Sequence, residues 1–245
     1  MDKSGRIQRF TSDGHMVHVW SMPATKKGKP VGLTVHPDGR VFVADTHYSR
    51  VVVFDRVGKI LAMFGQEGNG DGEFQLPTDV AIDADGYIYV SEYHGNDRIS
   101  KWTPDFTFVR AFGMEPIDGV RLSRPAAIDI DAAQTIWVAD ACNHRIVRFS
   151  RDGRVLGFFG HFGREAGGLR YPYDITVTPG GNLLVCEYGA DRLQWFTEKG
   201  QSLRTWGGSG REPGRLSGPW GATIGFGGKV VVVDSLNSRI QIIRP

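Results

Sequence analysis

A repeat of 47 or 48 residues runs through this chain and constrains its fold more than any other feature of the sequence. Each unit opens at a proline, carries an acidic residue fifteen positions later, and has an arginine five or six positions after the acid. The prolines are Pro30, Pro77, Pro125, Pro172 and Pro219, the acids are Asp45, Glu92, Asp140, Glu187 and Asp234, and the arginines are Arg50, Arg98, Arg145, Arg192 and Arg239. Five units in one frame indicate that a single supersecondary unit is repeated, each copy packing on its neighbours.

Each unit reads as four antiparallel β-strands. The stretch LTVHPDGRVFVAD, residues 33–45, is an apolar run, a Pro-Asp-Gly turn and a second apolar run, which is the pattern of a tight hairpin. A third strand such as RIVRFS (145–150) and a fourth such as RVLGFFG (154–160) follow after a loop. Because the second strand is apolar on consecutive residues, both of its faces are expected to be covered. Four-stranded sheets packed face to face around an axis provide that cover, so the sequence predicts an all-β protein of the β-propeller class.

The two ends of the chain carry complementary parts of the unit. Residues 6–20 match a third and a fourth strand, whereas residues 222–243 match the first three strands. We therefore expect residues 15–20 to pair with the C-terminal strands, which would close a propeller of five blades. The alternative is an incomplete six-bladed ring. Either way, residues 1–245 are expected to form a single propeller domain.

The composition excludes several classes of protein. A net charge of +2 and a charged content of 23% give no strong attraction to nucleic acid or to a membrane surface. The two cysteines, Cys142 and Cys186, lack CxxC spacing and are expected to be free thiols. No apolar run is long enough to span a bilayer, and residues 1–10 contain no signal-peptide core. The chain begins inside a repeat, so its cellular compartment is left open.

The phrases DACNHRI (140–146) and DSLNSRI (234–240), with the endings AMFG (62–65) and GFFG (157–160), resemble the NHL repeat family of β-propellers. The resemblance implies a propeller that serves as a protein-binding, RNA-binding or sensor domain, or as a peptidyl-α-hydroxyglycine amidating lyase. In that lyase a zinc-ligating histidine directly follows the opening proline of a blade. The residues found there in this chain are Val31, Thr78, Ala126, Tyr173 and Trp220. The relationship to the lyase is therefore expected to be distant, without its zinc site.

The two richer classes of loop are expected on one face of a propeller, because the strands alternate in direction. These are the loop between the second and third strands and the Gly-rich loop between units. The inter-unit loops mix arginines with acids rather than forming a basic surface, which disfavours nucleic acid. We expect a monomer that binds a protein or small-molecule ligand on this loop-rich face, as a binding or scaffold module.

Two units share a set of residues that the others lack. Asp79, Glu92 and Tyr93 in the second unit match Asp174, Glu187 and Tyr188 in the fourth. Carboxylates collected at a channel mouth can hold a divalent cation such as Ca²⁺ or act as an acid and base. The alternative function is therefore a metal-dependent lyase or lactonase-like enzyme, with Asp79, Asp174, Glu92 and Glu187 as its catalytic or metal-binding candidates. The acid and arginine present in every unit are expected to be a structural ion pair.

The remaining candidates are aromatic and basic residues of the same loop-rich face, which are the residue types that favour contact with a ligand. The predicted ligand-binding residues are Tyr93, Tyr188, Tyr173, Trp220, Arg124 and Arg170.

Overall fold

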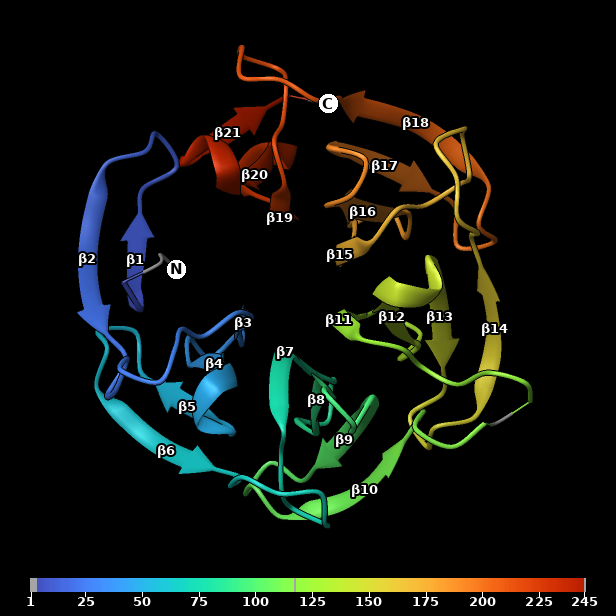
Figure 1. Ribbon diagram of the computed structural model, residues 1–245. Coiled ribbons are helices and arrows are strands. Elements are labelled where there is room, and N and C mark those ends of the chain that lie inside the picture. The colour runs from blue at the N-terminus through green and yellow to red at the C-terminus, as the bar shows by residue number, and fades with distance from the viewer. Residues whose placement is uncertain (1–3, 117, 245) are drawn as a thin grey trace. The chain divides into compact units, whose positions relative to one another are not determined.

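The computed structural model of this protein describes residues 4–116 and 118–244 and is built from β-strands, with four single-turn 3₁₀ segments (Figure 1). The chain divides into two compact units, residues 1–114 and 115–245. No helix in the described part of the chain has the length and apolar character needed to cross a membrane.

The first unit contains one two-stranded and two four-stranded antiparallel sheets. The two-stranded sheet pairs β1 (Arg6–Phe10) with β2 (Met16–Ser21). One four-stranded sheet comprises β3 (Leu33–Val35), β4 (Val41–Asp45), β5 (Arg50–Phe54) and β6 (Ile60–Phe64), with η1 (Thr46–Tyr48) between β4 and β5. The other comprises β7 (Leu76–Ile82), β8 (Ile88–Tyr93), β9 (Arg98–Trp102) and β10 (Phe108–Phe112).

The second unit contains two four-stranded sheets and one three-stranded sheet. The four-stranded sheets are β11 (Pro125–Ile130), β12 (Ile136–Asp140), β13 (Arg145–Phe149) and β14 (Val155–Phe159), and β15 (Pro172–Val177), β16 (Leu183–Glu187), β17 (Arg192–Phe196) and β18 (Ser202–Gly207). The third sheet is β19 (Pro219–Ile224), β20 (Val230–Asp234) and β21 (Arg239–Ile243). The 3₁₀ segments are η2 (Ala141–Asn143), η3 (Phe226–Gly228) and η4 (Ser235–Asn237).

Apolar side chains from neighbouring sheets form the core within each unit. In the second unit, Ala139 and Ile146 of one sheet pack with Leu183 and Phe196 of the next, and all four are fully buried. Every residue of β4, β12 and β16 is buried, as their consecutive apolar residues predicted. The second strand is thus the most completely buried strand of these three sheets, and the loops at its end are attached to this buried strand.

The all-β class and the four-stranded antiparallel sheets are confirmed. The terminal strands differ in detail from the expected closure. β2 forms a hairpin with β1, in which Ile7 lies opposite Trp20 and both pack against Phe54 and Val41. A short turn between adjacent strands makes this local pairing favourable. The β19–β21 sheet correspondingly has three strands, so the sheet composition is that of the alternative, the incomplete six-bladed arrangement.

Candidate functional site

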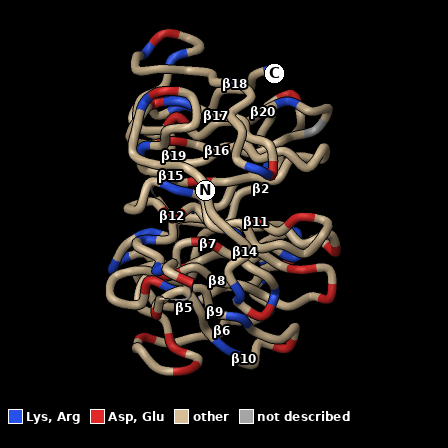
Figure 2. The backbone as a smooth tube through the Cα atoms, turned by 90° about the vertical axis from the view of Figure 1, so that its right-hand side faces the viewer, with Lys and Arg blue, Asp and Glu red and all other residues tan. Residues whose placement is uncertain are grey.

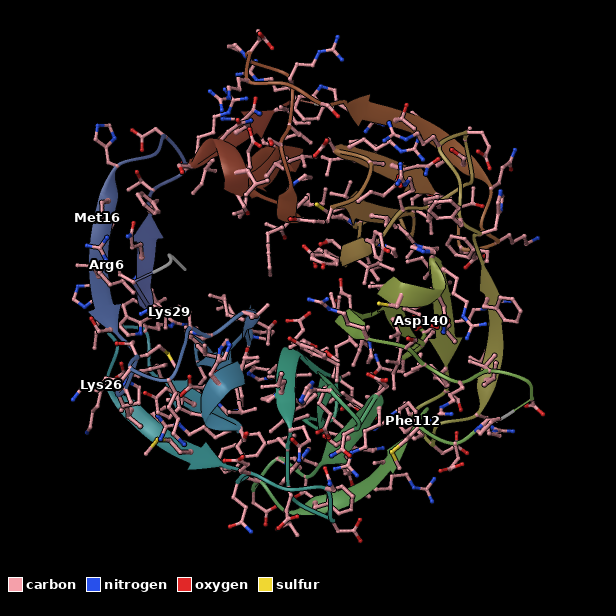
Figure 3. All side chains as sticks on the ribbon, in the orientation of Figure 1. Arg6, Met16, Lys26, Lys29, Phe112 and Asp140 are labelled. Atoms are coloured by element: carbon pink, nitrogen blue, oxygen red, sulfur yellow. The ribbon has the colours of Figure 1, made fainter. Side chains whose placement is uncertain are left out.

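The acid and arginine of each repeat form an ion pair at the end of the second strand. The nitrogen-to-oxygen distances lie between 2.6 and 2.8 Å in all five sheets, and every acid side chain is fully buried. Asp140, labelled in Figure 3, is the member of the β11–β14 sheet and pairs with Arg145 at 2.7 Å. The predicted structural role of these pairs agrees with this geometry.

Each of four pairs also fastens the loop that precedes its own sheet. In the β15–β18 sheet, Oε2 of Glu187 accepts the backbone N–H of Arg170 at 2.9 Å. Arg192 in turn donates to the carbonyl oxygens of Glu165 and Gly168 at 3.2 and 2.8 Å. The same backbone contact recurs from Gln75 to Glu92, from Ser123 to Asp140 and from Ser217 to Asp234. The ion pairs therefore fix the conformation of the loop-rich surface.

The two glutamates are fully engaged in these contacts. Glu92 accepts from Arg98, Gln75 and Asn96, and Glu187 accepts from Arg192, Arg170 and Gln194. Burial raises the pKa of both glutamates, while the arginine hydrogen bonds oppose that rise. Neither carboxylate is exposed, so neither can meet a substrate without breaking its ion pair.

Asp174 links the first strands of two neighbouring sheets. Its carboxylate accepts the N–H of Ile175 at 2.9 Å and, across to β19, the N–H of Ala222 at 2.8 Å. Asp129 makes the equivalent link from β11 to Val177 of β15, at 2.7 Å. Burial raises the pKa of Asp174 to about 7, its two backbone hydrogen bonds oppose this, and the charge of Asp129 adds to it. Asp174 thus connects two sheets by a hydrogen bond. Asp129, which makes the equivalent connection, was not among the residues predicted from the sequence.

The glycines two residues after the opening proline, Gly32 and Gly221, have a steric cause. A Cβ on Gly221 would lie 3.1 Å from the Oδ2 of Asp174, and a Cβ on Gly32 would lie 2.4 Å from the Oδ1 of Asp79. A side chain is therefore excluded at Gly32 unless its neighbours shift, and it would be crowded at Gly221.

A β-bulge lies directly after the opening proline in four of the five repeats. In the β15–β18 sheet, Pro172 lies opposite Glu187 and Asp174 opposite Cys186, which leaves Tyr173 as the extra residue. The same register shift singles out Thr78, Ala126 and Trp220. A bulge changes the direction of a side chain from the regular alternation of the strand. The residue at this position differs from repeat to repeat, so it can give each repeat a different surface.

Three aromatic residues meet in the second unit and form what we call the aromatic cluster: Tyr173, Tyr188 and Trp220. The rings of Tyr173 and Tyr188 stack with centroids 4.7 Å apart and planes 17° apart. Trp220 packs edge-on against both, at 5.3 and 5.9 Å, and is 40% exposed. Two of the three occupy bulge positions, and Tyr188 follows the buried Glu187. The sequence predicted all three as ligand-binding residues, but the stacking comes from the folded arrangement.

Arg124 and Gly218 complete the surroundings of the aromatic cluster. The guanidinium of Arg124 lies over the ring of Tyr173, 5.3 Å from its centroid. Gly218 has φ +50°, and a Cβ there would approach Tyr188 to 2.9 Å, so the absent side chain leaves room for the ring. Stacking, bulges and a close backbone together hold the aromatic rings in place.

Two predicted ligand-binding residues lie outside this cluster. Arg170 packs its guanidinium over Phe162 at 5.2 Å, in a group where His144 also contacts Phe162 and Tyr171. Tyr93, in the first unit, contacts the ring of His94 edge-on at 6.5 Å. The six predicted residues therefore fall into separate groups, of which the aromatic cluster with Arg124 is the largest.

The described residues offer no ligand set for a cation: nowhere in 4–116 or 118–244 do three His, Cys, Asp or Glu side chains gather as a metal site requires. The proposed Ca²⁺ candidates Asp79, Asp174, Glu92 and Glu187 do not form such a group. Both cysteines are free thiols, Cys142 exposed and Cys186 buried. Charges of both signs are interspersed along the loops of each unit (Figure 2).

Comparison with known families supports the repeat assignment. Residues 122–149 match the family described as NHL repeat, and residues 29–99 match one described as 6-bladed beta-propeller. The chain is 26% identical over 207 residues to NHL repeat-containing protein 3 of Homo sapiens, covering 75% of this chain and 55% of that protein. The chain thus spans about half the length of this curated relative.

A second curated relative and a solved structure are also similar to this chain. Peptidyl-glycine alpha-amidating monooxygenase B of Xenopus laevis is 31% identical over 172 residues, which is 63% of this chain and 18% of that protein. A solved streptogramin B lyase superposes on 99% of this chain and 77% of its own, with a TM-score of 0.70 and 17% identity. The resemblance to NHL-repeat propellers and the distant relation to the amidating enzyme are confirmed. The likeness to streptogramin B lyase shows the β-propeller fold alone.

Proposed function

We propose that this chain, with its NHL-type repeats, is a protein-binding module whose contact surface is centred on the aromatic cluster and Arg124. The observation that carries this proposal is the packing of Tyr173, Tyr188 and the part-exposed Trp220 at one place on the loop-rich side of the second unit. Trp, Tyr and Arg are the residue types enriched among the few residues that dominate binding energy at protein interfaces.

The rigidity of the cluster favours binding. Tyr173 and Trp220 project from the β-bulges of β15 and β19, and the absence of a side chain at Gly218 leaves room for the ring of Tyr188. Aromatic rings that are held before contact lose little side-chain entropy on association. The loop beside them is fastened by Arg192 and Glu187, so the backbone around the cluster is also preorganised.

A protein partner suits this surface better than nucleic acid. Arg164 and Arg170 share their loop with Glu165, and Arg211 and Arg215 share theirs with Glu212. A surface of alternating charge lacks the excess of cations that phosphate binding requires, whereas a polar rim of mixed sign around an aromatic centre is typical of protein interfaces.

The enzymatic alternative has less support. Glu92 and Glu187 are occupied by buried ion pairs, and Asp174 is occupied by two backbone N–H groups. A carboxylate with a raised pKa marks a catalytic residue only when its proton can reach a substrate, and here the hydrogen bonds of Asp174 join two strands. We therefore propose no reaction for this chain on the basis of its similarity to the amidating enzyme.

The test uses site-specific photocrosslinking. A photoreactive phenylalanine analogue in place of Trp220 should give discrete crosslinked products in an extract of the source cells, because the ring is at the centre of the contact surface. The matched control places the same analogue at Phe10, which is 43% exposed in the first unit. Trp220→Ala in a second, unlabelled copy should fail to compete with the crosslink. Equal products at both positions, or none at Trp220, would contradict the proposal.

A further inference from the structure

The acid and arginine of the first repeat lack the partners that their counterparts have. Within the described part of the chain, Asp45 accepts a hydrogen bond from Nε of Arg50 at 2.8 Å and from no other residue. The Oδ1 of Asp45 and the Nη2 of Arg50 are both buried without a hydrogen-bond partner there, and the side chain of Asp45 is fully buried. A buried polar atom without a partner is unfavourable, so this pair can bind a group that supplies one donor and one acceptor.

The other four sheets show which groups bind these two atoms. Each acid accepts a backbone N–H from the loop before its sheet, at a distance between 2.7 and 2.9 Å. Each arginine donates to backbone carbonyl oxygens of the same loop, as Arg98 does to Gly70 and Glu73 at 3.1 and 3.0 Å. The missing partners of the first pair are therefore the two groups that any extended polypeptide offers.

Two differences in sequence explain why the first repeat does not supply these groups itself. Its loop is shorter, because Pro30 follows Trp20 by ten residues, whereas each later opening proline follows the corresponding aromatic residue by thirteen. Tyr48 also takes the place of an asparagine whose amide bonds the acid in three other sheets: Asn96, Asn143 and Asn237. The β3–β6 sheet packs against β1–β2 and β7–β10, which belong to the same unit, so this difference arises within the first unit.

The short loop is also basic. Residues 22–29, MPATKKGK, contain three lysines and no acid. Lys26 and Lys27 are exposed, and the Nζ of Lys27 and the Cζ of Arg50 lie 5.8 and 5.0 Å from the centroid of the Tyr48 ring. The loops before the four later sheets all contain at least one acid: 66–75, 114–123, 161–170 and 208–217. The cations around the first pair therefore favour a ligand with negative charge.

Exposed hydrogen bonds hold this loop in place. The N–H of Lys27 donates to the hydroxyl of Tyr48 at 3.0 Å, and Nδ1 of His47 bonds the carbonyl oxygen of Lys29 at 2.9 Å. The later loops are instead fastened by their buried acid and arginine. Because solvent can replace exposed hydrogen bonds, the loop 22–29 can shift at a lower cost than the others.

We propose that an acidic peptide segment of a partner protein binds the Asp45–Arg50 pair and shifts the loop 22–29. One backbone N–H of the segment donates to Oδ1 of Asp45, and one of its carbonyl oxygens accepts from Nη2 of Arg50. Its acidic side chains pair with Lys26 and Lys27, which gives the site its preference among peptides. The site lies in the first unit and the aromatic cluster in the second, so the inference does not depend on the proposed function.

Two loops of the chain provide matched probe peptides. Residues 66–75, QEGNGDGEFQ, carry three acids and supply the backbone groups that bind the ion pair of the β7–β10 sheet. Residues 208–217, GSGREPGRLS, supply the same groups in the β19–β21 sheet but contain two arginines and one acid. The labelled 66–75 peptide, with both ends blocked, should bind the intact protein with a Kd below about 100 µM at low salt, measured by fluorescence anisotropy. The 208–217 peptide should bind at least about tenfold more weakly.

Variants of the first repeat locate the site. Tyr48→Asn introduces the asparagine of the other sheets, whose amide can bond Asp45. This variant should raise the melting temperature by about 2–4 °C and weaken binding of the 66–75 peptide at least about tenfold. Tyr48→Phe should bind the peptide at least as tightly as the parent, because it keeps the ring and removes the hydroxyl that holds the loop.

A charge variant tests the lysines separately. Lys27→Ser should weaken peptide binding roughly fivefold through loss of one exposed ion pair. Lys59→Ser, which changes an exposed lysine in the turn between β5 and β6, is the matched control and should leave the Kd unchanged. An equal loss for both lysine variants would show that the peptide senses only the net charge of the protein and would contradict the site.

Three other results overturn the proposal. These are no binding of the 66–75 peptide at about 100 µM, equal affinity of the two peptides, and an unchanged Kd for Tyr48→Asn. A single-stranded RNA that binds in a Lys27-dependent way, while neither peptide binds, would assign the loop to nucleic acid and overturn it too. A crystal structure grown with the 66–75 peptide that shows only ordered water at Oδ1 of Asp45 would have the same consequence.

Discussion

The β7–β10 and β15–β18 sheets carry the same Asp, Glu and Tyr at the same repeat positions, yet only the second displays an aromatic cluster. In the β7–β10 sheet the bulge residue is Thr78, whose hydroxyl bonds the hydroxyl of Ser91 at 2.7 Å and is buried. In the β15–β18 sheet the bulge residue is Tyr173, which stacks on Tyr188. The shared residues build the scaffold, and the residue at the bulge decides what that scaffold displays.

The largest expected effect is on stability, and it tests the buried ion pair that the two sheets share. Glu92→Ala and Glu187→Ala should each lower the free energy of unfolding by about 3–5 kcal/mol, because each leaves a largely buried arginine unpaired. The loss should be greater for Glu92, since the side chain of Arg98 is 6% exposed and that of Arg192 is 14% exposed. Chemical denaturation measures both. Asp152→Ala, which breaks the exposed pair with Arg154, is the control and should change stability little.

The next effect tests the part that differs. Trp220→Ala and Tyr173→Ala should each weaken binding of a crosslinked partner by about 2 kcal/mol, which is roughly a thirtyfold rise in Kd. Tyr93→Ala, which changes the β7–β10 counterpart of Tyr188, should leave the Kd unchanged. Titration of the purified partner against the three variants measures this. An equal loss for Tyr93→Ala would show that the two sheets act alike.

Alanine substitutions at Gly32 and Gly221 compare how closely the backbone of each glycine approaches the neighbouring sheet. A Cβ on Gly32 would lie 2.3 Å from the carbonyl oxygen of Thr78, whereas the nearest atom to a Cβ on Gly221 lies at 3.1 Å. Gly32→Ala should therefore cost about 2–3 kcal/mol of stability and Gly221→Ala about 1 kcal/mol. Adding Asp174→Ala should relieve the crowding in the Gly221→Ala variant, because Asp174 is the group that the new Cβ meets, and should have no such effect in the Gly32→Ala variant. Denaturation midpoints that rank the two glycine variants in the opposite order would contradict this account.

The smallest effect is a pH dependence at Asp174. Its folded pKa of about 7 lies above the usual value of 3.8, so the folded protein binds the proton more tightly than the unfolded chain. Stability from this group is complete below about pH 4 and is lost as the pH rises toward 7. Asp174→Asn should reduce that decline by on the order of 1 kcal/mol, measured as the change in unfolding free energy between pH 4.5 and 7.

Part of the decline should survive in the Asp174→Asn variant. Burial also raises the pKa of Asp129, Asp140, Glu92 and Glu187, so these acids contribute in the same direction. A variant whose pH profile matched the parent would show that Asp174 is ionised throughout this range. In that case the role of Asp174 would be to accept the hydrogen bonds from Ile175 and Ala222.

Much of the fold could be predicted from the sequence because the repeat is strict. In four of the five repeats the fifteen-residue offset from proline to acid places the acid opposite its opening proline across the first strand pair, as Pro172 lies opposite Glu187. The apolar runs of the second strands gave their burial on both faces. The structural role of the acid and arginine could also be predicted, because a residue pair present in every repeat is more simply explained by the repeated fold than by a single binding site.

The sequence by itself determined the strands, the turns and the residues that distinguish one unit from another. Tertiary structure alone decided which of those differences meet: Tyr173, Tyr188 and Trp220 are separated by 15 and 32 positions along the chain and become neighbours only when β15 and β19 pack together. It also decided that Asp174 accepts a backbone N–H from the neighbouring strand β19, and that β2 pairs with β1. Periodicity is a local property of the chain, whereas stacking, bulge direction and strand pairing depend on packing between segments distant in sequence.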